Sequence, residues 1–277
     1  MLITPGRFTM KVIVLPFILV CFLQNTSSTL QAQDYHLIWS DEFNYEGYPD
    51  SIKWRFEEGF VRNKEAQYYT TRRLDNARVK NGNLILEARK EGFKSGEYTS
   101  ASITTLNKQQ FLYGRIEVRA KLPVGKGTWP AIWLLGTNIN EVKWPYCGEI
   151  DIMENVGYDS LKIHGNIHTK AYHHSINTNK GNAILVENPW ENYHVYAIEW
   201  HPDRIDFYCD TTKYFTFEND FKGDDETWPF NKPQYLLLNL AIGGSWGGQQ
   251  GIDDSHFPHK FYIDYVRYYS ITSKNEN

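Results

Sequence analysis

The segment Tyr113-Gly-Arg-Ile-Glu-Val-Arg-Ala-Lys121 alternates between apolar or small residues and charged residues at every second position. In an extended chain, successive side chains point to opposite sides, so Ile116 and Val118 share one face and Arg115 and Glu117 share the other. This period of two is typical of a β-strand with one face in a core and one face in water.

The same period recurs along the chain, and it predicts an all-β protein. Strands are expected at residues 77–79, 84–88, 161–168, 194–200, 204–209, 235–242 and 261–269. Asn81-Gly82 lies between the first two and is a strong hairpin signal. In 161–168 the alternation places Leu161, Ile163 and Ile167 inward. Residues 235–242 are apolar on both faces apart from Asn239, which indicates a central strand. From Asp34 onward we find no amphipathic helical stretch of ten or more residues. Irregular segments are expected at about 137–148, 171–193, 218–233 and 243–259, and the tail after Ser270 is expected to be frayed.

The N-terminus carries the features of an export signal. An apolar run at residues 12–23 follows Arg7 and Lys11 and precedes a polar segment with small residues. The run is shorter than the roughly 20 residues needed to span a bilayer. We therefore predict a signal peptide over 1–33, export to the periplasm or medium, and no stable membrane insertion of the mature chain. Val20 before Cys21 disfavours a lipoprotein signal, and a start at Met1 or at Met10 stays open.

The mature chain is expected to be one catalytic domain over 34–272, followed by a short polar tail at 273–277. The full chain has a net charge of −4, which becomes −6 once Arg7 and Lys11 leave with the signal. This balance argues against nucleic acid as a partner. Two cysteines remain in the mature chain, Cys147 and Cys209, and the sequence leaves open whether they form a disulfide or stay free.

The segment Gly148-Glu-Ile-Asp-Ile-Met-Glu-Asn155 places three acids within six residues of an apolar strand. Glu149 and Asp151 share a face in a regular strand, whereas Glu154 would point into the core, where an unpaired carboxylate is costly. Either the acids lie on opposite faces, or a β-bulge around Ile152 and Met153 returns Glu154 to the face of the other two.

The bulged arrangement would bring three like charges together, so at least one carboxyl pKa should rise above its usual value. A raised pKa is what a general acid needs near neutral pH. A solvated acidic face is the alternative for two carboxylates, but three acids without an interleaved basic residue favour a functional site.

These residues resemble the signature of glycoside hydrolase family 16 in the bulged form typical of laminarinases. Further segments from about His36 to Tyr269 resemble the family in the same order: Leu37-Ile-Trp-Ser-Asp-Glu-Phe43, Asn63-Lys-Glu-Ala-Gln-Tyr-Tyr69, Tyr113–Lys121, Gly127-Thr-Trp-Pro-Ala-Ile-Trp133 and Ile263-Asp-Tyr-Val-Arg267. The resemblance implies a concanavalin-like β-jelly-roll sandwich of two curved antiparallel sheets, with a substrate groove on the concave side.

The resemblance also implies roles for individual residues. Glu149 is expected to be the nucleophile, Glu154 the general acid and base, and Asp151 the residue that holds the pair and tunes its protonation. The expected substrate-binding residues are two hydrogen-bonding side chains, three rings on which glucose units stack, and a histidine beside the acid and base: Asn63, Glu65, Trp129, Trp133, Trp246 and His168.

Other chemistries are weaker on the same residues. His164 and His168 lie about 13 Å apart along a strand and cannot share one ion, so we exclude zinc there. Gly243-Gly-Ser245-Trp-Gly247 matches the serine-hydrolase nucleophile pattern, but the α/β context that this motif needs is missing. Asp253 and Asp254 could ligate calcium, but the EF-hand spacing is absent. The sequence therefore leaves a structural calcium ion open.

The sequence therefore predicts a monomeric, exported endo-β-glucanase that hydrolyses β-1,3-glucan with retention, without a required cofactor and without a catalytic metal. Mixed-linkage β-1,3-1,4-glucan and galactans are the alternative substrates within the family. Transglycosylation would use the same intermediate. A non-catalytic lectin-like binding module is the alternative from another class, since fold alone does not fix function.

Overall fold

A computed structural model describes residues 1, 2, 6 and 34–272 of the 277-residue chain. The predicted signal peptide over 1–33 and the predicted tail at 273–277 lie outside the described residues. The fold below therefore concerns residues 34–272, which cover the predicted catalytic domain.

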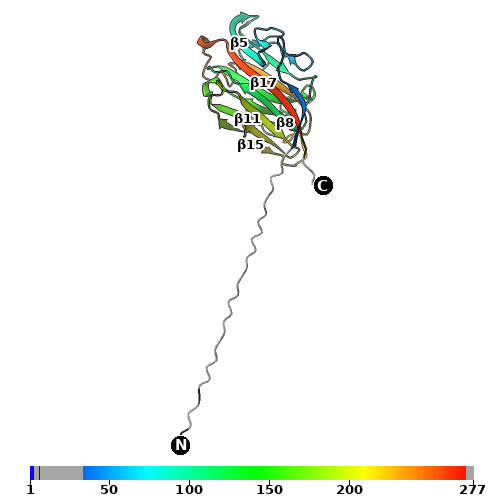
Figure 1. Cartoon of the computed structure of the whole chain (residues 1–277), viewed down its shortest axis with the longest axis vertical. Helices are drawn as coiled ribbons and strands as arrows, with labels where there is room; N and C mark the ends of the chain where they lie inside the picture. The colour runs from blue at the N-terminus through cyan, green and yellow to red at the C-terminus, as the bar shows by residue number, and fades with distance from the viewer. Residues whose placement is uncertain (3–5, 7–33, 273–277) are drawn as a thin grey trace. The chain divides into compact units, whose positions relative to one another are not determined.

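The first of two sheets has ten strands, in the order β15-β14-β13-β8-β17-β5-β6-β3, with β1 also paired to β17 and β4 to β5. Figure 1 shows β8 beside β17 and β5 on the other side of β17. The strands are β1 (Asp34–Asp41), β3 (Gln67–Tyr69), β4 (Ala77–Lys80), β5 (Asn83–Phe93), β6 (Gly96–Ser100), β8 (Gly114–Lys121), β13 (His194–Trp200), β14 (Arg204–Cys209), β15 (Thr212–Glu218) and β17 (His259–Thr272).

The second sheet has seven strands in the order β12-β11-β10-β9-β16-β7-β2, and it carries the acidic segment on its third strand. All pairs in it are antiparallel, and the two sheets together form the predicted β-jelly-roll sandwich. The strands are β2 (Arg55–Phe56), β7 (Ser102–Thr104), β9 (Thr128–Gly136), β10 (Glu149–Glu154), β11 (Lys162–His168), β12 (Lys180–Leu185) and β16 (Gln234–Ile242).

Helical structure in the described residues is confined to short turns. These are α1 (Ile139–Val142), η1 (Gly157–Asp159), η2 (His174–Ile176) and η3 (Asp254–His256). None of the helices in this part of the chain has the length and apolar character needed to cross a bilayer.

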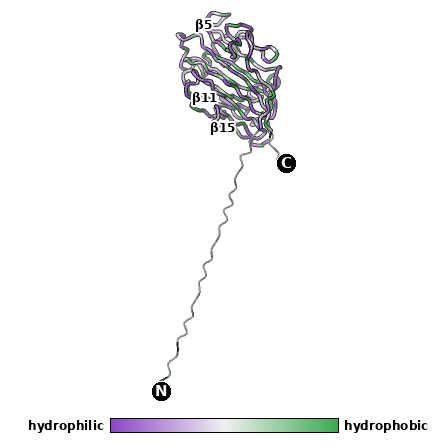
Figure 2. The backbone as a smooth tube through the Cα atoms, viewed as in Figure 1, coloured by the Kyte–Doolittle hydropathy of each residue, from purple (hydrophilic) through white to green (hydrophobic). Residues whose placement is uncertain are grey.

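The core fills the space between the two sheets. In β8 the residues alternate between buried and half-buried from Gly114 to Lys121, as the sequence predicts. Figure 2 shows hydrophilic and hydrophobic colours following one another along the strands of the domain. Every residue of β16 is buried, which confirms the predicted central strand. Asn81 and Gly82 both have positive φ, the geometry that the tight turn between β4 and β5 requires.

Three sequence-based expectations are wrong in detail. Leu161 was expected to point inward but is 45% exposed, because it precedes β11 and lies outside the pleat that buries Ile163 and Ile167. The segment 171–193, expected to be irregular, contains β12, whose polar sequence hides the strand period. Ile271 still belongs to β17 and pairs with Tyr35, although the sequence after Ser270 reads as frayed.

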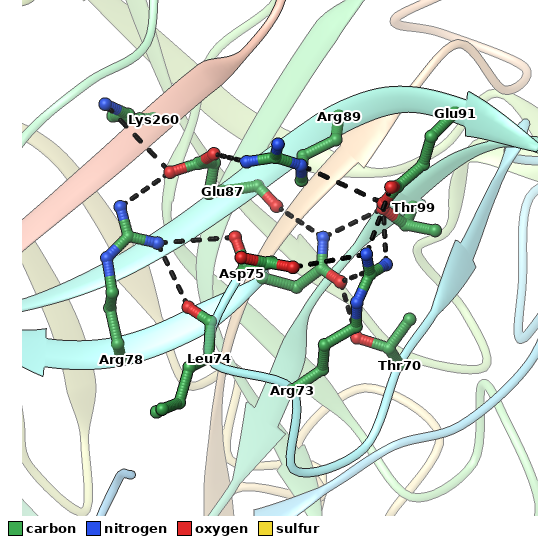
Figure 3. Close-up of polar contacts among 11 residues, drawn as sticks. Thr70, Arg73, Leu74, Asp75, Arg78, Glu87, Arg89, Glu91, Thr99 and Lys260 are labelled. Carbon is green, nitrogen blue, oxygen red and sulfur yellow. Dashed lines mark hydrogen bonds and ion pairs between the residues drawn. The ribbon is translucent and has the colours of Figure 1, made fainter. Parts of the chain in front are cut away.

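The outer face of the ten-stranded sheet carries an ion-pair network (Figure 3). Glu87 on β5 has only 3% of its side chain exposed and is paired with Arg78, Arg89 and Lys260. Arg78 lies on β4 and Lys260 on β17, so the buried carboxylate links three neighbouring strands. Burying this charge is tolerated because three cations compensate it.

The question of a disulfide, which the sequence leaves open, is settled by the structure. Cys147 and Cys209 are both buried and both free. Cys147 precedes β10 and Cys209 ends β14, and the two belong to separate apolar clusters.

Candidate active site

A β-bulge in β10 brings the three acids to one face of the seven-stranded sheet. The pairing of β10 with β9 shifts register between Asp151 and Met153, and its pairing with β11 shifts between Asp151 and Glu154. Ile152 and Met153 are consecutive, yet both are fully buried in the core between the sheets. The extra inward residue restores Glu154 to the face of Glu149 and Asp151, as predicted for the bulged alternative.

Glu154 is held by two hydrogen bonds from neighbouring strands. The indole N–H of Trp129 on β9 donates to its Oε1 at 3.0 Å, and the amide of Asn166 on β11 donates to its Oε2 at 3.0 Å. The residue is 9% exposed. Both carboxylate oxygens are therefore fixed in orientation by side chains of the flanking strands.

Glu149 is held from the other side by a residue outside the sheet. The indole N–H of Trp144, in the loop before β10, donates to Glu149 Oε2 at 2.9 Å. The Trp144 ring lies 5.3 Å from the His173 ring and 5.2 Å from the His174 ring, centroid to centroid. The loop between β11 and β12 thus packs against the tryptophan that orients Glu149.

His168 lies between two of the carboxyl groups. Its Nε2 is 3.3 Å from Asp151 Oδ2 and 3.7 Å from Glu149 Oε1. The pairing of β10 with β11 places Glu149 opposite His168 and Asp151 opposite Asn166, so adjacent strands supply both contacts. His168 thus lies beside Asp151 and Glu149 on the acidic face of the sheet.

All three carboxyl groups have raised pKa values. Burial is the largest cause for each one. For Glu149, burial and the repulsion of Asp151 raise the pKa to about 8, while His168 opposes the rise. Burial and the charge of Glu154 raise the pKa of Asp151 well above its usual range. Burial also raises the pKa of Glu154, against the hydrogen bonds from Asn166 and Trp129. With the pKa of Glu149 at about 8, the cluster is not fully ionised at neutral pH.

Trp133 lies on the same face of β9 as Trp129, and the two side chains have the same exposed fraction of 8%. Its indole N–H donates to Asn239 on β16 at 2.8 Å, and the Asn239 amide donates to the Tyr69 hydroxyl at 3.2 Å. The Arg62 guanidinium lies over the Trp133 ring, 5.0 Å from its centroid. One ring face is thus covered by a cation.

Trp246 extends the face beyond Glu154. Its ring lies 5.6 Å from the Trp129 ring and 5.0 Å from the His164 ring, centroid to centroid. The loop that carries Trp246 begins at Gly243 and Gly244, where positive φ values turn the chain after β16. Trp129 and Trp246 therefore form one aromatic group next to Glu154.

Asn63 and Glu65 lie together at the end of β16, next to the loop that carries Trp246. The Asn63 amide donates to Glu65 Oε1 at 3.3 Å, and the Gln67 amide donates to Glu65 Oε2 at 2.7 Å. Burial raises the pKa of Glu65, which is 7% exposed. A bridge between Glu65 and Gly243 connects this segment to the end of β16.

Several residues of this site had no predicted role in it: Arg62, Trp144, Asn166, His174 and Asn239. Asn239 carried a signal, since it interrupts an otherwise apolar strand. Trp144 precedes Glu149 by five residues in a segment expected to be irregular, and only the folded loop brings its indole back over the carboxylate.

The acids considered for calcium are engaged within the chain. Asp253 accepts from the Ser255 backbone and hydroxyl and is paired with His256, and Asp254 is paired with Lys90 and with the Tyr98 hydroxyl. Among the residues that the structure describes, groups close enough to share a metal ion are three: Glu149–Asp151–His168, Glu199–His201–Asp206 and His194–Cys209–Asp210.

A jelly-roll sheet that presents this acidic cluster beside tryptophan rings is the site of a glycoside hydrolase. The chain belongs to glycosyl hydrolases family 16, whose model matches residues 64–267. A β-glucanase of Rhodothermus marinus is 46% identical over 257 residues, which is 90% of each chain.

Solved structures agree with this assignment. A laminarinase from Rhodothermus marinus is 46% identical with a TM-score of 0.84, covering 87% of this chain and 99% of that chain. A non-specific endo-β-1,3(4)-glucanase of the same family is 48% identical with a TM-score of 0.82, covering 86% and 91%.

Proposed function

We propose that this chain is an endo-acting β-1,3-glucanase that cleaves laminarin-type glucan with retention of anomeric configuration. The observation that carries the proposal is the bulge in β10, since it sets Glu149, Asp151 and Glu154 on one face. A retaining glycosidase needs two carboxyl groups about 5 to 5.5 Å apart on either side of the scissile bond. The relatives named above, a β-glucanase and a laminarinase, support the choice of substrate.

In the first step the Glu149 carboxylate attacks the anomeric carbon and forms a glycosyl ester. Glu154 gives its proton to the glycosidic oxygen, which leaves with the reducing-side fragment. In the second step the Glu154 carboxylate takes a proton from water, the water oxygen attacks the anomeric carbon, and the ester to Glu149 breaks. Two inversions give net retention.

The surrounding residues support these roles. Attack requires the ionised form of Glu149, which His168 and the Trp144 N–H favour against the burial that raises its pKa to about 8. Burial favours the protonated form of Glu154, which leaving-group protonation requires. Asp151 lies between the two in sequence, burial and the charge of Glu154 raise its pKa, and His168 lies 3.3 Å away. This assignment uses side chains of the chain alone, and we propose that no organic cofactor and no metal act in catalysis.

For substrate binding, we propose that glucose units stack on Trp129 and Trp246 and are hydrogen-bonded by Asn63 and Glu65. Arg62 covers one face of the Trp133 ring, so we propose that Trp133 contacts the sugar through its ring edge and that Arg62 contacts it from above the ring. His168 would contact the sugar at the cleavage point.

A mixed-linkage β-1,3-1,4-glucanase is the second candidate, because the solved relative with 48% identity is a non-specific endo-β-1,3(4)-glucanase. We further propose that the mature protein begins near Asp34, is exported, and acts as a monomer. The segment at residues 12–23 supports export.

Product analysis with role-specific variants tests the proposal. Wild type, Glu149→Ser and Glu154→Ala are incubated with laminarin, barley mixed-linkage glucan and agarose. We expect short oligosaccharides from laminarin with the wild type, whose first-formed reducing ends are β anomers by NMR, and none from the two variants. Products longer than the substrate would indicate transglycosylation. Binding of laminarin without cleavage by the wild type would instead support a lectin-like module.

Azide separates the two catalytic roles. An aryl β-laminaribioside has a good leaving group and can glycosylate Glu149 without an acid, so azide should rescue Glu154→Ala and yield a β-glycosyl azide. In Glu149→Ala, azide takes the place of the missing nucleophile and should yield an α-glycosyl azide. The opposite pattern of anomers would exchange the roles of the two glutamates.

A further inference from the structure

A second cluster of reactive side chains lies at one end of the ten-stranded sheet. His194 begins β13, Cys209 ends β14, and Asp210 follows in the turn to β15. One potential ligand atom from each of the three lies within 4.8 Å of the others. The strand register explains this proximity. Tyr196 on β13 pairs with Cys209 on β14, and His194 lies two residues before Tyr196 on the same face, which makes it a diagonal neighbour of Cys209.

The cluster contains polar atoms whose hydrogen-bonding capacity is unused. His194 Nδ1 lies 2.8 Å from Asp210 Oδ2, but the buried Nε2 of the same ring has no hydrogen-bond partner. The hydroxyl of Tyr196, which is fully buried next to Cys209 in the ladder, also has none. A buried polar group without a partner costs roughly 1–3 kcal/mol, so the chain alone does not fully satisfy the polar groups at this end of the sheet.

The charge around the cluster distinguishes it from the other two groups. Glu149, Asp151 and His168 belong to the active site. In the group of Glu199, His201 and Asp206, both acids are already paired with arginines. Asp210 is different, because within residues 34–272 its ion-pair partner is His194 alone. A dication would thus meet a carboxylate that no lysine or arginine neutralises.

We propose that His194, Cys209 and Asp210 bind a zinc ion that ties β13 to the turn between β14 and β15. A thiolate, an imidazole and a carboxylate are the ligand types that zinc prefers, and water would complete a tetrahedron. The Cys209 thiol gives its proton to solvent on binding, and the imidazole–carboxylate hydrogen bond is exchanged for bonds to the ion. Entry is open, since Asp210 has 49% and His194 15% of its side chain exposed.

Cobalt provides a probe that reports the ligands directly. The mature wild-type protein is stripped with a chelator and titrated with Co²⁺, and thiolate-to-cobalt charge-transfer absorption is recorded in the near ultraviolet. Zinc retained by untreated protein is counted by mass spectrometry of the metal. The variants are Cys209→Ser, His194→Gln and Asp210→Asn. Cys147→Ser is the matched control, because Cys147 is the other buried free thiol and lies in none of the metal-capable groups of the described chain.

We expect one Co²⁺ per chain with a thiolate band in wild type and in Cys147→Ser. The band should be lost in Cys209→Ser, and affinity in His194→Gln should fall by more than the roughly 10- to 100-fold that loss of an outer-shell partner costs. No thiolate band in wild type, or a band that persists in Cys209→Ser, overturns the proposal. Should Cys209→Ser not fold, the more exposed Asp210→Asn decides by the same drop in affinity. Laminarin hydrolysis should be equal in wild type and Asp210→Asn, so the outcome is independent of the proposed function.

Discussion

Replacing Glu149 by glutamine should stabilise the folded chain at pH 7 and leave its stability nearly unchanged at pH 4. Burial and Asp151 raise the pKa of Glu149 from 4.5 to about 8, and only 16% of its side chain is exposed. The native state therefore holds this proton to higher pH than the unfolded state does. Between pH 4.5 and 8, release of the proton lowers the free energy of the unfolded state but not that of the native state. The wild type therefore loses stability as pH rises through this range.

The size of the effect follows from the two pKa values. At pH 7, keeping the proton of Glu149 costs the native state about 3 kcal/mol relative to the unfolded state, and at pH 4 about 0.2 kcal/mol. Glutamine has no such proton, and its amide oxygen can still accept the hydrogen bond from Trp144. For a domain of this size, the gain at pH 7 corresponds to an increase in Tm of roughly 6–12 °C.

Differential scanning calorimetry of wild type and Glu149→Gln at pH 4, 5.5 and 7 measures this. Glu97→Gln is the control, since it removes the same charge from an exposed position of β6 and should not change the pH dependence. A Tm difference that is the same at pH 4 and pH 7, or a less stable variant at pH 7, would refute the argument that burial raises this pKa.

Three further changes test other parts of the structure. Trp144→Phe keeps an aromatic ring but removes the N–H that holds Glu149, so kcat on laminarin should fall by about 10-fold or more with little change in Tm; an unchanged kcat would show that this hydrogen bond is dispensable. Gly157→Ala would place a Cβ 1.8 Å from the carbonyl oxygen of Gly125, so urea denaturation should show a loss of about 1–3 kcal/mol, and a stability within error of wild type would contradict the close packing seen there. Glu87→Gln removes the charge that pairs with Arg78 and Arg89 on the outer sheet face, so Tm should fall by roughly 2–8 °C at low salt and by less at high salt. A loss in Tm, relative to wild type, that is equal at both salt concentrations would argue against an electrostatic role.

The sequence alone was sufficient for the fold class and for the acids. Alternation in 113–121, the apolar run at 235–242 and the Asn81-Gly82 turn all depend on near neighbours in the chain, and the structure confirms each of them. The bulge was one of two arrangements that the sequence left open, because a regular strand would bury an unpaired Glu154, and the structure selects it. Short polar strands such as β12 were missed because they bury too little apolar surface to leave a period.

Only the tertiary structure decided how the acids are held. Trp144, Asn166 and His168 come from a loop and a neighbouring strand, and no spacing along the chain reports that they converge on β10. The cover of Arg62 over the Trp133 ring likewise arises between segments about 70 residues apart. The sequence thus determined which residues carry charge and which faces are buried, because those properties are local. Proximity between distant segments, and with it the raised pKa of each carboxyl group, exists only once the two sheets have closed on their core.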